Sequence, residues 1–90
     1  MNYAEFSTGS YGNLHEMTIN NRYFRKVIDT TPTQQLVLMS IDVNEDIGKE
    51  IHPYNTQFIK IESGSCIAML ENEYIELKKN HFIVVVLLRA

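Results

Sequence analysis

From residue 22 onward, short β-prone runs alternate with turn residues, and this alternation most constrains the fold. The run 35–43 shows it most clearly, because Val37, Met39 and Ile41 share one face while Leu36 and the residues alternating with it share the other. Turn residues interrupt such runs every six to ten positions or so. Many short strands at this spacing predict an all-β sandwich or barrel.

The predicted strands cover most of the chain after a polar N-terminal segment. We expect strands at 22–29, 35–43, 49–52, 57–62, 66–70 and 74–77, and a last one from Phe82. The turn at 63–65 predicts that strands 57–62 and 66–70 form a hairpin. The expected organisation is therefore an N-terminal segment, 1–21, followed by one β-domain, 22–90.

Composition excludes several classes of protein. The 90 residues suit one domain, and a net charge of −3 without a basic cluster argues against binding nucleic acid. A single cysteine cannot form an internal disulfide, and the N-terminus lacks the pattern of a signal peptide. The longest apolar run, 82–88, is too short to span a membrane. We expect a soluble, cytoplasmic protein without a nucleic-acid or membrane partner.

Several side chains have expected positions that the structure can test. Cys66 is expected to be a buried or half-buried structural thiol, because no histidine stands at catalytic spacing from it. Lys60 and Glu62 alternate with Ile59 and Ile61, which predicts that both charges lie on the exterior. Met39 and Met69 are expected to pack in the core.

A small set of polar residues lies among the aliphatic ones. Glu50 and His52 are two residues apart, so both side chains leave the same face of an extended strand. Gln57 begins the next run and shares a face with Ile59 and Ile61. We expect Glu50, His52 and Gln57 to converge inside a small β-barrel. A simpler role stays open for each residue. Glu50 could be a carboxylate at the rim, His52 a solvated histidine, and Gln57 an amide that is hydrogen-bonded to backbone or water.

The same region resembles the first motif of the cupin superfamily, G-x5-H-x-H-x4-E-x6-G. The spacing fits when Asn44 is placed at the first Gly, Glu50 and His52 at the two histidines, Gln57 at the Glu and Gly64 at the last Gly. A small, phosphomannose-isomerase-like cupin subgroup is similar over about residues 16–85. The matching residues are Asn20, Asn21, 24–27, 35–40, 47–52, Gln57 and Phe58.

The resemblance implies a jelly-roll β-barrel and a site in its interior. Glu50, His52 and Gln57 would hold a divalent Mn, Fe, Ni or Zn ion, and only weakly, because the set contains a single imidazole and a neutral amide. A sugar-like small molecule would be the ligand, with isomerase-like or oxygenase-like chemistry if the protein is an enzyme.

The segment 86–90 departs from the family, whose second motif follows at this point. We therefore expect a barrel truncated before that motif and incomplete at its C-terminus. Open sheet edges would then allow a homodimer. The alternatives are a non-catalytic remnant that acts through self- or partner association, and a shortened gene product without an independent role. Which ligand or metal binds is left open.

Overall fold

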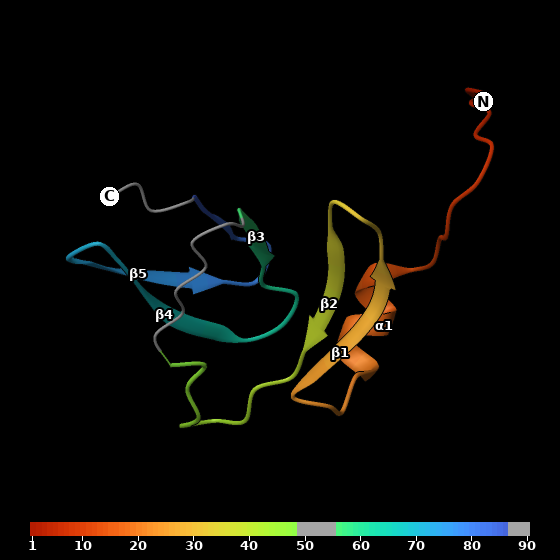
Figure 1. Ribbon diagram of the computed structural model, residues 1–90. Helices are drawn as coiled ribbons and strands as arrows, with labels where there is room; N and C mark the ends of the chain where they lie inside the picture. The colour runs from red at the N-terminus through yellow and green to blue at the C-terminus, as the bar shows by residue number, and fades with distance from the viewer. Residues whose placement is uncertain (49–55, 87–90) are drawn as a thin grey trace. The chain divides into compact units, whose positions relative to one another are not determined.

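The computed structural model describes residues 1–48 and 56–86, which form one short helix and six strands (Figure 1). The strands pair as three two-stranded antiparallel sheets, β1–β2, β3–β6 and β4–β5, and none of the three is closed within the described residues. The expectation of a mostly β protein is confirmed. The elements are α1 (Leu14–Asn20), β1 (Arg25–Thr30), β2 (Gln35–Met39), β3 (Gln57–Lys60), β4 (Ser65–Leu70), β5 (Glu73–Lys78) and β6 (Phe82–Val85).

The chain divides into two compact units, Met1–Ser40 and Ile41–Ala90. The N-terminal unit contains α1, β1 and β2, and the C-terminal unit contains β3 to β6. Residues 1–21, expected as a separate polar segment, therefore lie in the same compact unit as the first hairpin. The division of the chain into folding domains at residue 21 stays a prediction.

Asparagines at both ends of α1 define the helix. The side chain of Asn13 accepts a hydrogen bond from the backbone N–H of Glu16 (3.0 Å), which satisfies one of the free donors at the helix N-terminus. At the other end, the buried side chain of Asn21 donates to the carbonyl of Tyr23 (2.8 Å) and accepts from its N–H (3.2 Å). These bonds form a turn, so β1 begins at Arg25 and not at Arg22 as expected.

The β1–β2 hairpin is held at both ends. The hydroxyl of Thr31 accepts from the N–H groups of Thr33 and Gln34 in the connecting turn. At the open end, the N–H of Ser40 donates to the carbonyl of Tyr23 (3.1 Å). Leu38 is the buried residue of this hairpin, 4% exposed. Strand β2 ends at Met39, short of the expected Val43, because its partner β1 begins opposite that residue.

The expected hairpin between strands 57–62 and 66–70 is wrong. Strand β4 pairs along its whole length with β5, and the two-residue loop Glu71–Asn72 joins them. Strand β3 pairs with β6, and the pairing continues where the N–H of Ile61 donates to the carbonyl of His81 (3.0 Å). A two-residue loop closes a hairpin at small entropic cost, which explains why β4 pairs with the strand that follows it.

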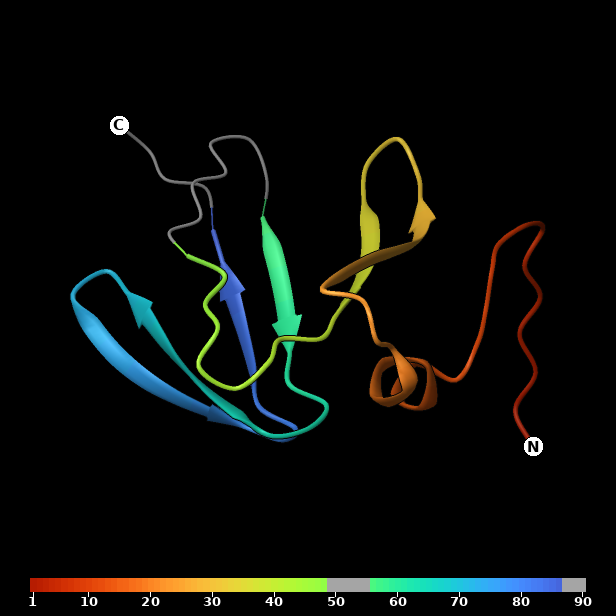
Figure 2. The same ribbon diagram turned by 90° about the horizontal axis from the view of Figure 1, so that it is seen from below.

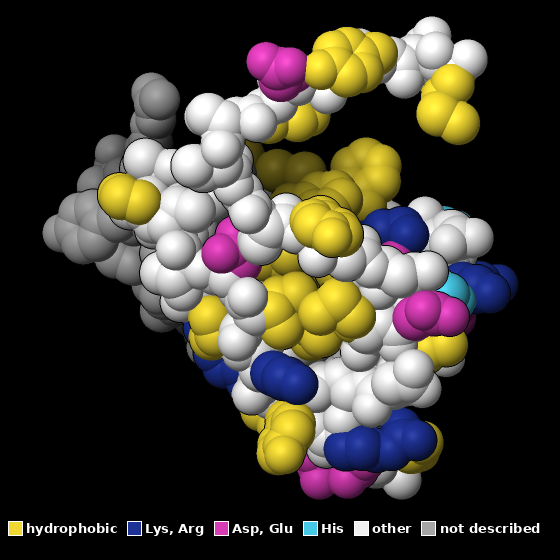
Figure 3. Space-filling model, turned by 90° about the vertical axis from the view of Figure 1, so that its right-hand side faces the viewer, with side chains coloured by type: hydrophobic (Ala, Val, Ile, Leu, Met, Phe, Trp, Pro, Cys, Tyr) yellow, Lys and Arg dark blue, Asp and Glu magenta, His cyan; other side chains and the backbone are white. Residues whose placement is uncertain are grey.

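The predicted exposure of three side chains in this unit is also wrong. The pairing of the strands does not by itself show these errors. Cys66 and Met69 are exposed, because two-stranded sheets cover little of either face. Glu62 is buried, 8% exposed, while Leu77 is the buried apolar residue among the described residues of the unit. Figure 2 shows the β4–β5 hairpin and the β3–β6 pair of this unit. Figure 3 faces α1, β1 and β2 of the N-terminal unit, where hydrophobic side chains are visible among polar ones.

No helix within the described residues has the length and apolar character needed to cross a membrane.

Candidate functional site

Gln57 is the part of the expected site that the structure describes. It begins β3, is half-buried, and lies directly opposite Val85 of β6. Glu50 and His52 lie outside the described residues, so the convergence of the three side chains stays a prediction.

The face of the β3–β6 pair that carries Gln57 is otherwise aliphatic. Strand alternation puts Ile59 on the same face, and the register adds Ile83 and Val85 from the neighbouring strand. These β6 side chains are half-buried, as Gln57 is. The amide of Gln57 is thus a polar group in an aliphatic row, and it offers one neutral oxygen acceptor and two N–H donors.

The opposite face of the same pair is aromatic and exposed. Phe58 and Phe82 are 68% and 62% exposed, and their ring centroids lie 6.0 Å apart with the planes tilted by 31°. The exposed Val84 lies opposite Phe58. The two faces therefore differ: Gln57 is on the more buried, aliphatic face, and the aromatic face is in contact with solvent.

The sequence did not reveal an ion pair just beyond the end of β3. The Nζ of Lys60 lies 2.5 Å from the Oε1 of Glu62, and the Glu62 side chain is 7% exposed. Alternation puts Lys60 on the face of β3 away from Gln57, and Glu62 lies beyond the end of that strand. The Lys-x-Glu spacing is compatible with such a pair, but it is equally compatible with two solvated charges on an exposed strand face.

The described residues contain no group of three or more His, Cys, Asp or Glu side chains that could hold a metal ion. The donor types expected at the site are one imidazole nitrogen and two side-chain oxygens, from His52, Glu50 and Gln57. Divalent first-row ions accept such donors, and three protein ligands leave positions open for water or substrate. As donor types these residues would suit a weakly held divalent ion, and metal binding by them stays a prediction.

The sequence is similar to two uncharacterized proteins. It is 58% identical over 57 residues to an uncharacterized protein of Acanthamoeba polyphaga mimivirus, a match that covers 63% of this chain and 36% of that protein. It is 36% identical over 70 residues to the uncharacterized protein YrkC of Bacillus subtilis, covering 76% of this chain and 38% of YrkC. The chain spans little more than a third of the length of these curated relatives.

No protein-family model matches the sequence, and the search of solved structures gave no match. The names of the two relatives state no activity.

Proposed function

We propose that this chain is part of a cupin-type jelly-roll protein that binds a divalent metal ion, a small polar ligand or both on the Gln57 face. The observation that carries the proposal is the half-buried position of Gln57 in an aliphatic row, at the position where the motif of the cupin superfamily has its carboxylate ligand. The amide is half-buried, so solvent still reaches it, and a bound ion or ligand would take the place of water there.

The order of strand pairing supports the fold part of the proposal. Strands β4 and β5 pair with each other, and the strands that flank them in sequence, β3 and β6, pair outside them. The chain thus runs out along β3 and β4 and returns along β5 and β6. Greek-key and jelly-roll folds are built from antiparallel strands with such long-range returns.

In the proposed site, Glu50, His52 and Gln57 would hold the ion. A bound divalent ion would supply Lewis-acid polarisation of a carbonyl or hydroxyl oxygen of a sugar-like substrate. The aliphatic side chains beside Gln57 would exclude water from one side of the ligand, and exclusion of water strengthens electrostatic interactions. Isomerase-like chemistry is the activity that we assign to this arrangement.

The proposal is tested by thermal unfolding of the full chain with Zn²⁺, Mn²⁺, Ni²⁺ or Fe²⁺. An ion at 100 times its Kd would stabilise the folded state by about 2.7 kcal/mol, which raises the melting midpoint. His52→Ala should abolish the shift, whereas His15→Ala, which removes an exposed imidazole from α1, should preserve it. A shift that both variants retain, or no shift with any ion, would refute metal binding at this site.

A second candidate function is association without catalysis, favoured by the exposed aromatic face of Phe58 and Phe82. Exposed apolar patches often mark interaction surfaces. In this case sedimentation should show a concentration-dependent dimer, and Phe58→Lys should shift it toward monomer. A monomer at high concentration would rule out self-association through this face.

A further inference from the structure

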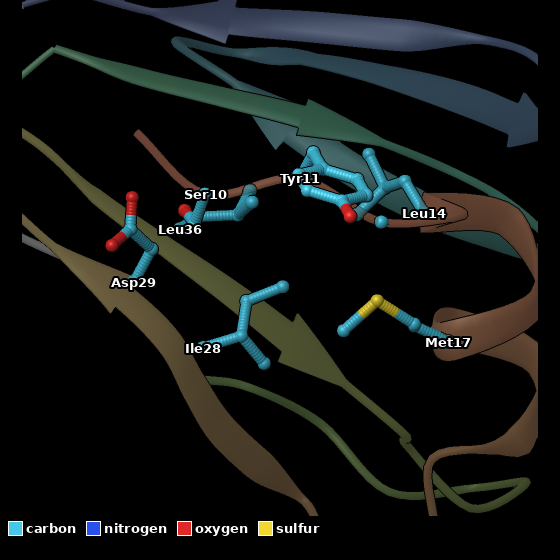
Figure 4. A pocket seen from close by; sticks show the side chains of 8 residues that line it. Ser10, Tyr11, Leu14, Met17, Ile28, Asp29 and Leu36 are labelled. Carbon is cyan, nitrogen blue, oxygen red and sulfur yellow. The ribbon is translucent and has the colours of Figure 1, made fainter. Parts of the chain in front are cut away.

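The N-terminal unit contains a cavity of about 270 Å³, separate from the proposed metal site (Figure 4). Its walls come from three places: the segment before α1, the helix itself and the β1–β2 hairpin. Most of the lining is apolar, and the one charged side chain is Asp29. The lining residues that matter here are Tyr11, Leu14, Met17, Ile28, Asp29 and Leu36.

A β-bulge explains why two consecutive residues of β1 line the same cavity. Val27 pairs with Val37 and Asp29 pairs with Leu36, so Ile28 is the extra residue. In a regular strand, Ile28 and Asp29 would point to opposite faces. A bulge changes the direction of one side chain, and bulges are frequent beside functional sites for this reason. The result is a carboxylate directly beside an apolar wall.

A close approach between Gly12 and Met17 shapes the other side of the cavity. A Cβ added at Gly12 would lie 2.9 Å from the sulfur of Met17, closer than such atoms normally approach. A Cβ there would make the flexible Met17 side chain move, so glycine at this position leaves the thioether where it lines the cavity. Figure 4 shows Met17 and Asp29 on opposite sides of Ile28, so the apolar and charged ends of the cavity are separate.

Within residues 1–48 and 56–86, neither the Lys60–Glu62 nor the Lys78–Glu76 salt bridge involves Asp29. A half-buried carboxylate beside an apolar wall is complementary to a cation that carries an apolar group.

We infer that this cavity binds a small organic ammonium ion, with the ammonium group at Asp29 and the apolar body against Ile28, Leu36 and Met17. The volume exceeds the roughly 150 Å³ that holds benzene, so a short alkylamine fits within the cavity. The inference does not depend on the proposed metal site, since every lining residue precedes residue 41.

The test is an NMR titration of the full chain with n-butylammonium chloride, with n-butanol as the uncharged probe. We expect saturable shifts of the Ile28, Asp29 and Leu36 amides at millimolar butylammonium, and binding of butanol at least tenfold weaker. Equal affinity for the two probes, or no saturable shift with butylammonium, would overturn the inference. This comparison uses the unmodified protein and does not depend on the folding of any variant.

Two variants locate the site, and a third serves as their control. Asp29→Asn keeps the size of the side chain and removes its charge, so the Kd for butylammonium should rise about tenfold. Asp42→Asn, the same change at an exposed aspartate outside the cavity, should leave the Kd unchanged. Gly12→Ala should weaken binding while Asp29 is intact, because its methyl group would displace the Met17 sulfur. Equal Kd values for Asp29→Asn and Asp42→Asn would contradict the assignment.

Discussion

Gln57 at the start of β3 lies directly opposite Val85 near the end of β6. Side chains of directly opposed residues in an antiparallel pair leave the same face, with their Cβ atoms about 4.5–5.5 Å apart. The amide of Gln57 therefore has an isopropyl group beside it. A ligand bound by that amide would be in contact with an apolar surface on this side.

The first prediction concerns the charge at this position. Gln57→Glu supplies the carboxylate that the cupin motif has here, so the proposed site should bind divalent ions more tightly. A tenfold gain in affinity is worth about 1.4 kcal/mol. In a domain of this size, each kcal/mol raises the melting midpoint by roughly 4–8 °C. Thermal unfolding with and without the ion measures the effect.

Gln34→Glu makes the same chemical change at an exposed turn residue of the N-terminal unit. Its ion-dependent shift should equal that of the unmodified chain. If Gln57→Glu gave no larger shift than Gln34→Glu, Gln57 would not be a ligand.

The sequence predicted the existence of most strands, but not how they pair. Runs such as 57–62 and 74–77 overlap the observed β3 and β5, because local β propensity and alternation are properties of the run itself. Which strand pairs with which depends on the relative entropic cost of closing the loops that join them. Strand β4 could pair with the strand before or after it, and the two-residue loop Glu71–Asn72 favours the latter. Only the folded structure resolves that choice.

Side-chain burial was predicted less well than strand location. Alternation placed Gln57, Ile59 and Ile61 on one face; Gln57 and Ile61 are half-buried, but Ile59 between them is 38% exposed. The same rule predicted that Glu62 is exposed, but Glu62 is buried. The rule fails there because Glu62 lies after the last residue of β3. Beyond the end of a strand, period-two alternation no longer fixes direction. The cavity at Asp29 was missed for a similar reason, since a bulge interrupts the alternation of β1.

The second prediction concerns the core of the N-terminal unit. Leu38 is 4% exposed, whereas Leu36 on the same strand is 45% exposed. Leu38→Ala should lower the free energy of unfolding by about 2–3 kcal/mol, toward the lower end of the range for buried leucines because the unit is small. Leu36→Ala should cost less than about 1 kcal/mol. Urea unfolding followed by the amide signals of β1 and β2 measures both, and equal losses would contradict the assignment of Leu38 as the core residue.

The third prediction compares two ion pairs, each between residues two positions apart in sequence. In the Lys60–Glu62 pair the carboxylate is 7% exposed, while in the Lys78–Glu76 pair both side chains are at least 60% exposed. Lys60→Met removes a cation from a buried carboxylate and should cost about 1–2 kcal/mol, discounted because Lys60 itself is partly exposed. Lys78→Met should cost less than about 0.5 kcal/mol.

Urea unfolding of the two variants and of the unmodified chain gives the comparison. A cost for Lys60→Met no greater than that for Lys78→Met would show that burial of Glu62 does not depend on its lysine partner.

The last prediction concerns the loop between β4 and β5. Glu71 has a φ of 57°, in the left-handed region that side chains with a Cβ rarely adopt, and it is the first of two loop residues. Asn72 is not among the described residues with positive φ. Positive φ at the first position alone is the pattern of a type II′ turn, which favours glycine there. Glu71→Gly should therefore raise the free energy of unfolding by about 0.5–1 kcal/mol.

Asn72→Gly is the matched control, because it adds the same flexibility to the unfolded chain without relieving strain. It should be neutral or destabilise the protein by up to about 1 kcal/mol. Urea unfolding distinguishes the two variants, with the Met69 and Tyr74 amides reporting on the paired strands next to the loop. If Glu71→Gly destabilised the chain as much as Asn72→Gly, the strain at Glu71 would be too small to matter. The β4–β5 pairing would then depend on its cross-strand contacts and not on the turn.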